Sequence, residues 1–217
     1  RLDVADELPD AFIEKIRAAV KRVSPEKFLL GEVWEDATTK YGFGHRRTYL
    51  LGKGLDSVMN YPFKNAVLDF VKGKPAQQAM NEILSICEHY PAPALNTALN
   101  FLSTHDTERA LTVIADEPAN GRGREWQSGR NVSGEAYEEG MLRLRMAYAI
   151  IYTLPGLPCL YYGDEIGMQG YRDPFNRGYY CWDSHEERLK PVLAQLAQLR
   201  HSCEAFRTGA LRVCLLY

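Results

Sequence analysis

The sequence lacks any apolar run near the roughly 20 residues that span a bilayer, so no membrane segment is expected. It also lacks an excess of either charge, because 26 Lys and Arg residues against 28 Asp and Glu residues leave a net charge of −2. So small a charge gives no reason to expect nucleic acid or a membrane surface as a partner. A chain of 217 residues with 46% hydrophobic and 25% charged residues fits one globular domain with a sizeable core.

Cysteine is scarce and irregularly placed. The five cysteines are odd in number and form no C-x-x-C pair, which argues against a metal cluster or a disulfide framework. This usage fits a reducing compartment, and we expect a cytoplasmic location. The chain also begins at Arg1 without methionine or a signal peptide, inside what reads as a strand. We therefore expect a piece of a longer protein, of which the true N-terminus is not present.

Short apolar segments alternate with helical patterns along the chain. The expected strands cover residues 2–5, 28–34, 55–61, 98–103 and 157–162. The expected helices cover residues 8–23, 63–71, 76–87, 107–115, 135–154 and 186–202, with loops at 36–54, 116–134 and 163–183. This alternation predicts an α/β fold in which crossover helices join parallel strands, either as a barrel or as an open doubly wound sheet. No glycine-rich turn follows the first strand, which disfavours a dinucleotide-binding sheet.

Polar residues follow the ends of the expected strands. They are Asp3, Glu32, His105-Asp106 and Gly163-Asp164-Glu165. In a (β/α)8 barrel, residues at these positions face the catalytic mouth at the C-terminal ends of the strands. The placement therefore favours the (β/α)8 TIM barrel over the open sheet.

Four segments in this order and spacing resemble strands four, five, seven and eight of the α-amylase superfamily, glycoside hydrolase family 13. They are Arg1-Leu2-Asp3-Val4-Ala5, Gly31-Glu32-Val33-Trp34, Phe101-Leu102-Ser103-Thr104-His105-Asp106-Thr107 and Pro158-Cys159-Leu160-Tyr161-Tyr162-Gly163-Asp164-Glu165-Ile166-Gly167-Met168. The run from Gly170 to Tyr180 resembles the neopullulanase, cyclomaltodextrinase and maltogenic amylase branch. The resemblance implies that residues 1–209 form the C-terminal half of the catalytic barrel, with strands four to eight. Residues 210–217 would begin a following β domain.

The resemblance also implies the catalytic residues. Asp3 matches the nucleophile and Glu32 the general acid of a retaining mechanism, which needs two carboxyl groups about 5–5.5 Å apart. Asp106 matches the third carboxylate, which grips sugar hydroxyls. Glu32 interrupts an apolar strand, where burial disfavours a charged carboxylate and so suits an acid that must arrive protonated. The alternative is an ordinary glutamate at a strand end.

Four more residues are candidates for substrate binding. Arg1 lies two residues before Asp3, on the same strand face, and can favour its charged form; the alternative is a surface ion pair. His105 matches a sugar-binding histidine, although a lone histidine is often structural. Asp173 and Arg177 resemble a donor-subsite pair, with an ordinary loop salt bridge as the alternative. Trp34, Tyr61, Tyr171 and Tyr180 are possible sugar-stacking platforms, with packing the commoner role of such residues.

The function implied is that of a retaining α-glucan hydrolase cleaving α-1,4 bonds, with α-1,6 bonds an option, in maltodextrins, cyclodextrins or pullulan. An α-glucanotransferase using the same site stays open, as does an inactive glucan-binding or assembly fragment. No redox cofactor and no metal ligand is expected in this chain; calcium in the family is bound mostly by segments that would precede Arg1. The expected partners are an oligosaccharide or polysaccharide α-glucan and either the missing N-terminal half or a second copy of the chain. The isolated chain is expected to be inactive.

Overall fold

Five parallel strand segments lie side by side, in chain order, in the computed structural model, which describes residues 1–212. The segment at Leu2 neighbours β1 (Leu30–Gly31), which pairs with β4 (Ser57–Val58); β4 is bridged to β5 (Leu99–Asn100), which pairs with β6 (Leu157–Pro158). The register is set by Leu2 opposite Gly31, Leu30 opposite Ser57, Met59 opposite Leu99, and Leu99 opposite Leu157. The parallel order predicted from strand–helix alternation is confirmed.

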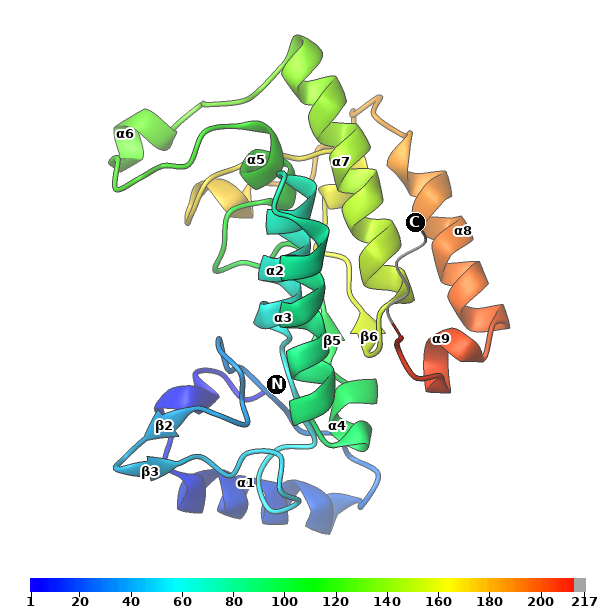
Figure 1. Ribbon diagram of the computed structural model, residues 1–217. Coiled ribbons are helices and arrows are strands. Elements are labelled where there is room, and N and C mark those ends of the chain that lie inside the picture. The colour runs from blue at the N-terminus through cyan, green and yellow to red at the C-terminus, as the bar shows by residue number, and fades with distance from the viewer. Residues whose placement is uncertain (213–217) are drawn as a thin grey trace.

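Helices lie between these strands along the chain and after the last of them (Figure 1). They are α1 (Asp10–Val23), α2 (Tyr61–Val71), α3 (Ala76–His89), α4 (Ala92–Asn96), α5 (Ala110–Ala115), α6 (Arg124–Gln127), α7 (Gly134–Thr153), α8 (Leu189–Ser202) and α9 (Ala205–Thr208). Three short 3-10 helices cover Ala5–Glu7, Asp164–Ile166 and Phe175–Arg177. An antiparallel hairpin, β2 (Tyr41–Gly42) with β3 (His45–Arg46), occupies the expected loop at 36–54.

The strands are much shorter than predicted, and the first is wrong beyond Leu2. Val4 adopts a left-handed conformation (φ 44°), and Ala5–Glu7 form a 3-10 helix. The backbone N–H of Val4 donates to the side chain of Glu32 at 2.9 Å instead of to a neighbouring strand. This side-chain contact turns the chain away from the sheet as soon as the ladder ends.

The third expected strand also ends early, because α2 begins at Tyr61. Asn60 caps the helix: its side chain accepts a hydrogen bond from the N–H of Phe63 at 3.3 Å. Pro62 lies in the first turn, where a missing N–H costs nothing. The proline therefore lies at the start of a helix, directly after the expected strand.

Several helices also differ from prediction. The helix expected at 107–115 begins at Ala110, the helix expected from residue 186 begins at Leu189, and α6 interrupts the expected loop at 116–134. Residues 210–212 carry no regular structure, and 213–217 lie outside the described residues. The β segment expected at 210–217 is therefore not present as a strand in residues 210–212, the part that the structure describes.

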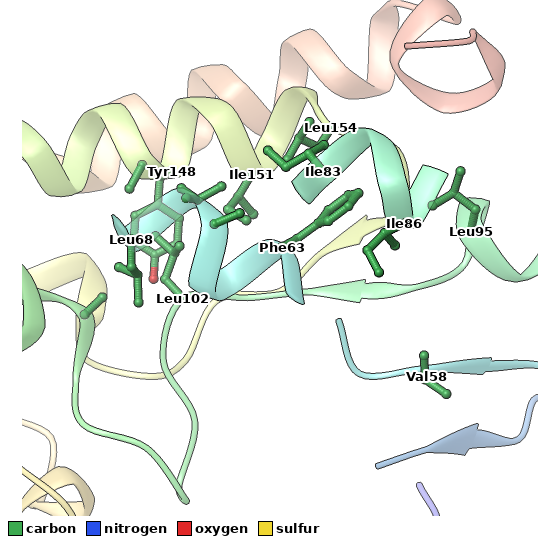
Figure 2. Packing of buried hydrophobic residues seen from close by; sticks show 14 of the residues in the cluster. Val58, Phe63, Leu68, Ile83, Ile86, Leu95, Leu102, Tyr148, Ile151 and Leu154 are labelled. Atoms are coloured by element: carbon green, nitrogen blue, oxygen red, sulfur yellow. The ribbon is translucent and has the colours of Figure 1, made fainter. Parts of the chain in front are cut away.

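The main core lies between the strands and the helices that cover them. Figure 2 shows Phe63 and Leu68 of α2 and Ile83 of α3 with Tyr148 and Ile151 of α7, and all five are at most 3% exposed. Fully burying one such large apolar side chain contributes about 1.5–3 kcal/mol. The core thus fixes the helices on one face of the sheet.

Within residues 1–212 the sheet stays open at both ends. The segment at Leu2 pairs only with β1, and β6 pairs only with β5. A (β/α)8 barrel closes with eight strands. Five parallel segments in chain order fit part of such a ring.

Candidate active site

Glu32 follows β1 directly and is almost completely buried, at 3% exposure. One carboxylate oxygen, Oε2, accepts the hydrogen bond from the N–H of Val4. The other, Oε1, lies 3.0 Å from Nη1 of Arg1 and 3.4 Å from the hydroxyl of Tyr61. Burial and three polar partners fix this carboxyl group in one orientation.

The guanidinium group of Arg1 contacts two carboxylates. Nη1 pairs with Glu32, and Nη2 pairs with Asp3. The sequence predicted only the pair with Asp3. One planar fork thus holds the two carboxyl groups expected to carry the chemistry.

Asp3 differs from Glu32 in its exposure. Its side chain is 70% exposed, whereas that of Arg1 is 29% exposed. The expectation that Asp3 lies within a strand over residues 2–5 is wrong, because the chain leaves the sheet after Leu2. The nucleophile candidate faces open space, where a ligand can approach it.

His105 and Asp106 lie on a turn between β5 and α5. Nε2 of His105 is 3.0 Å from Oδ2 of Asp106, and both side chains are partly exposed. Nη2 of Arg177 lies 3.6 Å from Oδ1 of Asp106, and Nε of Arg177 lies 2.9 Å from Oδ1 of Asp173. The salt bridge weighed as the alternative for Asp173 and Arg177 does form, and Arg177 also reaches Asp106.

The hydroxyl of Tyr61 contacts Glu32 and is also influenced by the charge of Asp106. Burial raises the pKa of Tyr61, and the negative charges of Glu32 and Asp106 act in the same direction. Its ring stacks on Trp34, with centroids 4.3 Å apart and an interplanar angle of 12°. Tyr61 itself is 1% exposed. It is therefore a packing residue and cannot serve as a sugar platform, whereas Trp34 remains 41% exposed.

The other two stacking candidates also pack against the protein. Tyr171 is 2% exposed and donates its hydroxyl to the carbonyl of Glu117 at 2.6 Å. The ring of Tyr180 lies 4.7 Å from that of Trp182. Burial excludes the platform role for Tyr171.

Asp164 was expected to face the catalytic mouth, and the structure buries it instead at 1% exposure. Its carboxylate accepts hydrogen bonds from Ser103 and Tyr148, both at 2.6 Å, and lies 3.2 Å from Nη1 of the fully buried Arg109. Burial raises the pKa of Asp164 to about 6, although Ser103, Tyr148 and Arg109 oppose this shift. The sequence shows Asp164 at a strand end but gives no signal that its partner is Arg109.

A match to the family model "Alpha amylase, catalytic domain" spans residues 6–208. The chain belongs to the α-amylase family. The catalytic domain of this family is a (β/α)8 TIM barrel, so the five parallel segments and their helices are part of that barrel. The matched range includes Glu32 and Asp106 but starts after Asp3.

Relatives in the α-amylase family cover nearly the whole chain. The chain is 34% identical over 222 residues to a cyclomaltodextrinase of Thermoanaerobacter pseudethanolicus, covering 100% of the chain and 33% of the relative. It is 33% identical over 216 residues to neopullulanase 2 of Thermoactinomyces vulgaris, covering 98% and 32%. The resemblance to this branch, predicted from the run 170–180, is confirmed.

Among solved structures, the ligand-free cyclic α-maltosyl-(1→6)-maltose hydrolase of Arthrobacter globiformis superposes with a TM-score of 0.79 at 28% identity. That match covers 100% of the chain and 43% of the other structure. The chain spans a third or less of the length of the curated relatives first matched. No helix in residues 1–212 is long and apolar enough to cross a membrane.

Proposed function

We propose that residues 1–209 are the C-terminal half of the barrel of a retaining α-glucan hydrolase acting on maltodextrins, cyclodextrins or pullulan. The observation that carries this proposal is the Arg1 guanidinium group, which touches the carboxylates of both Asp3 and Glu32. Two carboxyl groups within the span of one guanidinium group suit the short separation that a retaining mechanism needs. The relatives named cyclomaltodextrinase and neopullulanase support the substrate class.

In this mechanism Asp3 attacks the anomeric carbon of the sugar while Glu32 donates a proton to the leaving glycosidic oxygen. A β-glucosyl ester forms on Asp3 and the shortened glucan leaves. Glu32, now ionised, removes a proton from water, which attacks the ester and releases the sugar with its original configuration.

Asp106 and His105 would bind hydroxyl groups of the same sugar. Each oxygen of Asp106 has a cation or a ring nitrogen beside it, namely Nη2 of Arg177 and Nε2 of His105. Such fixed carboxylates stabilise the oxocarbenium-like transition state by gripping the distorted ring. Asp173 would bind a sugar of the glucan at a donor subsite.

The stereochemistry of the first product tests the proposal. In the full-length polypeptide that contains residues 1–217, maltotriose hydrolysis followed by proton NMR should show the α-anomer first, because two displacements restore the configuration. The β-anomer as first product would contradict the roles of Asp3 and Glu32. Oligosaccharides longer than maltotriose would instead identify an α-glucanotransferase on the same site.

The 217-residue chain alone is expected to be inactive on maltodextrins and to associate through its open strand edges. Unpaired edges with exposed apolar residues favour pairing with another chain, and Val4 and Leu157 beside the two edges are 48% and 45% exposed. The partner would be the missing half of the barrel or a second copy. Size-exclusion chromatography with light scattering, run beside a reducing-sugar assay, checks this. A cooperatively melting monomer that hydrolyses maltotriose would refute it.

A cytoplasmic location also stays a prediction. A reducing cytoplasm would keep Cys87, Cys159, Cys181 and Cys203 as the free thiols that they are in the structure.

A further inference from the structure

The turn at residues 104–107, which carries His105 and Asp106, has few hydrogen bonds of its own. Among the described residues, none of its four backbone N–H groups donates to a backbone carbonyl. Two bonds come from its own threonines: Thr104 N–H donates to Oγ1 of Thr107 at 3.3 Å, and Asp106 N–H donates to Oγ1 of Thr104 at 3.1 Å. A turn that lacks backbone ladders depends on side chains for its shape.

Residues 170–177, which we call the strap, lie against this turn. The strap is attached at its start, where the N–H of Arg109 donates to the carbonyl of Gly170 at 2.9 Å. The N–H of Gly170 donates in return to Oγ1 of Thr112 at 2.8 Å. The strap cannot shift here without breaking both bonds.

Asn176 attaches the other end of the strap and is fully buried, at 0% exposure. Its Nδ2 group donates to the carbonyls of His105 and Thr107, both at 2.8 Å, and approaches the carbonyl of Thr104 at 3.3 Å. An amide carries two N–H donors, so the two hydrogens are shared among three carbonyls of one turn. In a helix or strand, backbone N–H groups would donate to these carbonyls. Here the amide of Asn176 donates to them instead.

The next residue, Arg177, extends the attachment to the side chain of Asp106. Its Nε donates to the carbonyl of His105 at 3.0 Å, and its Nη2 lies 3.6 Å from Asp106. Asn176 and Arg177 share one 3-10 helix, Phe175–Arg177. The buried amide therefore also sets where the Arg177 guanidinium group meets Asp106.

We propose that Asn176 is a positioning residue, whose buried amide holds the 104–107 turn so that Asp106 presents its carboxylate to the bound sugar. The proposal rests on the proposed function, because it needs Asp106 to act on a sugar. It assigns to Asn176 a role through Asp106 and no contact with the substrate.

The test uses Asn176→Asp in the full-length polypeptide, which keeps the side-chain size but turns a carboxylate toward three carbonyl oxygens. Misplacing a catalytic group by about 1 Å costs on the order of 100-fold in rate, so we expect kcat on p-nitrophenyl α-maltoside to fall about 10- to 100-fold, with a smaller change in KM. Asn100→Asp is the matched control. Asn100 is equally buried and donates Nδ2 to the carbonyl of Pro155 at 2.7 Å. Asn100→Asp should therefore lower stability in the same way as Asn176→Asp. Because Asn100 shares no hydrogen bond with the 104–107 turn within residues 1–212, the kcat of Asn100→Asp should stay within about twofold of wild type.

The double variant decides whether Asn176 acts through Asp106. Asp106→Asn alone should lower kcat, and adding Asn176→Asp should then cost little more, because residues that act as a unit are not additive. Equal losses in both backgrounds, or wild-type kcat in Asn176→Asp, would overturn the positioning role. Wild-type kcat in Asp106→Asn would instead reject the proposed function, and the positioning role with it.

If Asn176→Asp fails to fold, Asn176→Ser is tested in its place, because serine retains one hydrogen-bond donor. The serine variant should show a loss of kcat between those of wild type and Asn176→Asp, with the same small change in KM. A serine variant that melts like wild type and keeps full kcat would overturn the proposal.

Discussion

Replacing Glu32 by Gln is expected to slow hydrolysis of natural α-glucans by about 10²- to 10⁴-fold, the usual contribution of a general acid. A substrate with an activated leaving group needs little protonation, so formation of its glycosyl-enzyme should survive far better. Glutamine keeps the shape of Glu32, but its single carbonyl oxygen can accept from only one of the two donors, Val4 N–H or the Tyr61 hydroxyl, which contact different oxygens of Glu32. The measurement is kcat on maltotriose beside the burst of phenol from an aryl α-maltoside.

Asp3→Asn is the matched comparison for Glu32→Gln. It removes the nucleophile, so it should abolish turnover of both substrates whatever the leaving group. If both variants respond alike to leaving-group activation, the roles assigned to Asp3 and Glu32 are wrong.

Replacing Arg109 by Met is expected to lower the free energy of unfolding by about 3–5 kcal/mol at pH 7, because it leaves the Asp164 carboxylate buried without its cation. It also removes the hydrogen bond from Nη1 to the carbonyl of Tyr162, at 2.7 Å. Urea unfolding measures the change. Arg188→Met is the control, since Arg188 is 57% exposed in its pairs with Glu186 and Glu138 and should cost no more than about 1 kcal/mol.

The penalty for Arg109→Met should shrink as the pH falls toward 5. Burial raises the pKa of Asp164 to about 6, above its ordinary value in the unfolded chain. The stability that follows from this shift is fully present below about pH 4 and is lost as the pH rises through 6. Without Arg109 the pKa rises further, so the loss extends to higher pH. A penalty equal at pH 5 and pH 7 would contradict this account.

The parallel order of the strands could be predicted from the sequence, because apolar segments that alternate with helical faces are a local pattern. Asp3, Glu32 and Asp106 came from the resemblance to the α-amylase family together with their places at strand ends, and their catalytic roles stay predictions. Strand lengths could not be predicted, because side-chain contacts end the ladders: Glu32 with Val4, and Asn60 with Phe63.

The residues that hold the site in place could not be predicted, because they act through contacts between positions far apart in the sequence. Asn176 lies 71 positions from His105, and Asp164 lies 55 positions from Arg109. Neither spacing leaves a periodic signal. The second partner of Arg1 was missed for the same reason, since Glu32 comes from a different strand.

The attachment of the turn by a later segment has a consequence for synthesis on the ribosome. The chain emerges with Asp3, Glu32 and Asp106 long before residues 170–177. Until Asn176 is made and buried, the carbonyls of His105 and Thr107 lack the donor that the folded protein gives them. A nascent chain stalled before residue 170 would therefore hold all three carboxylates yet leave the turn around Asp106 free to sample other shapes.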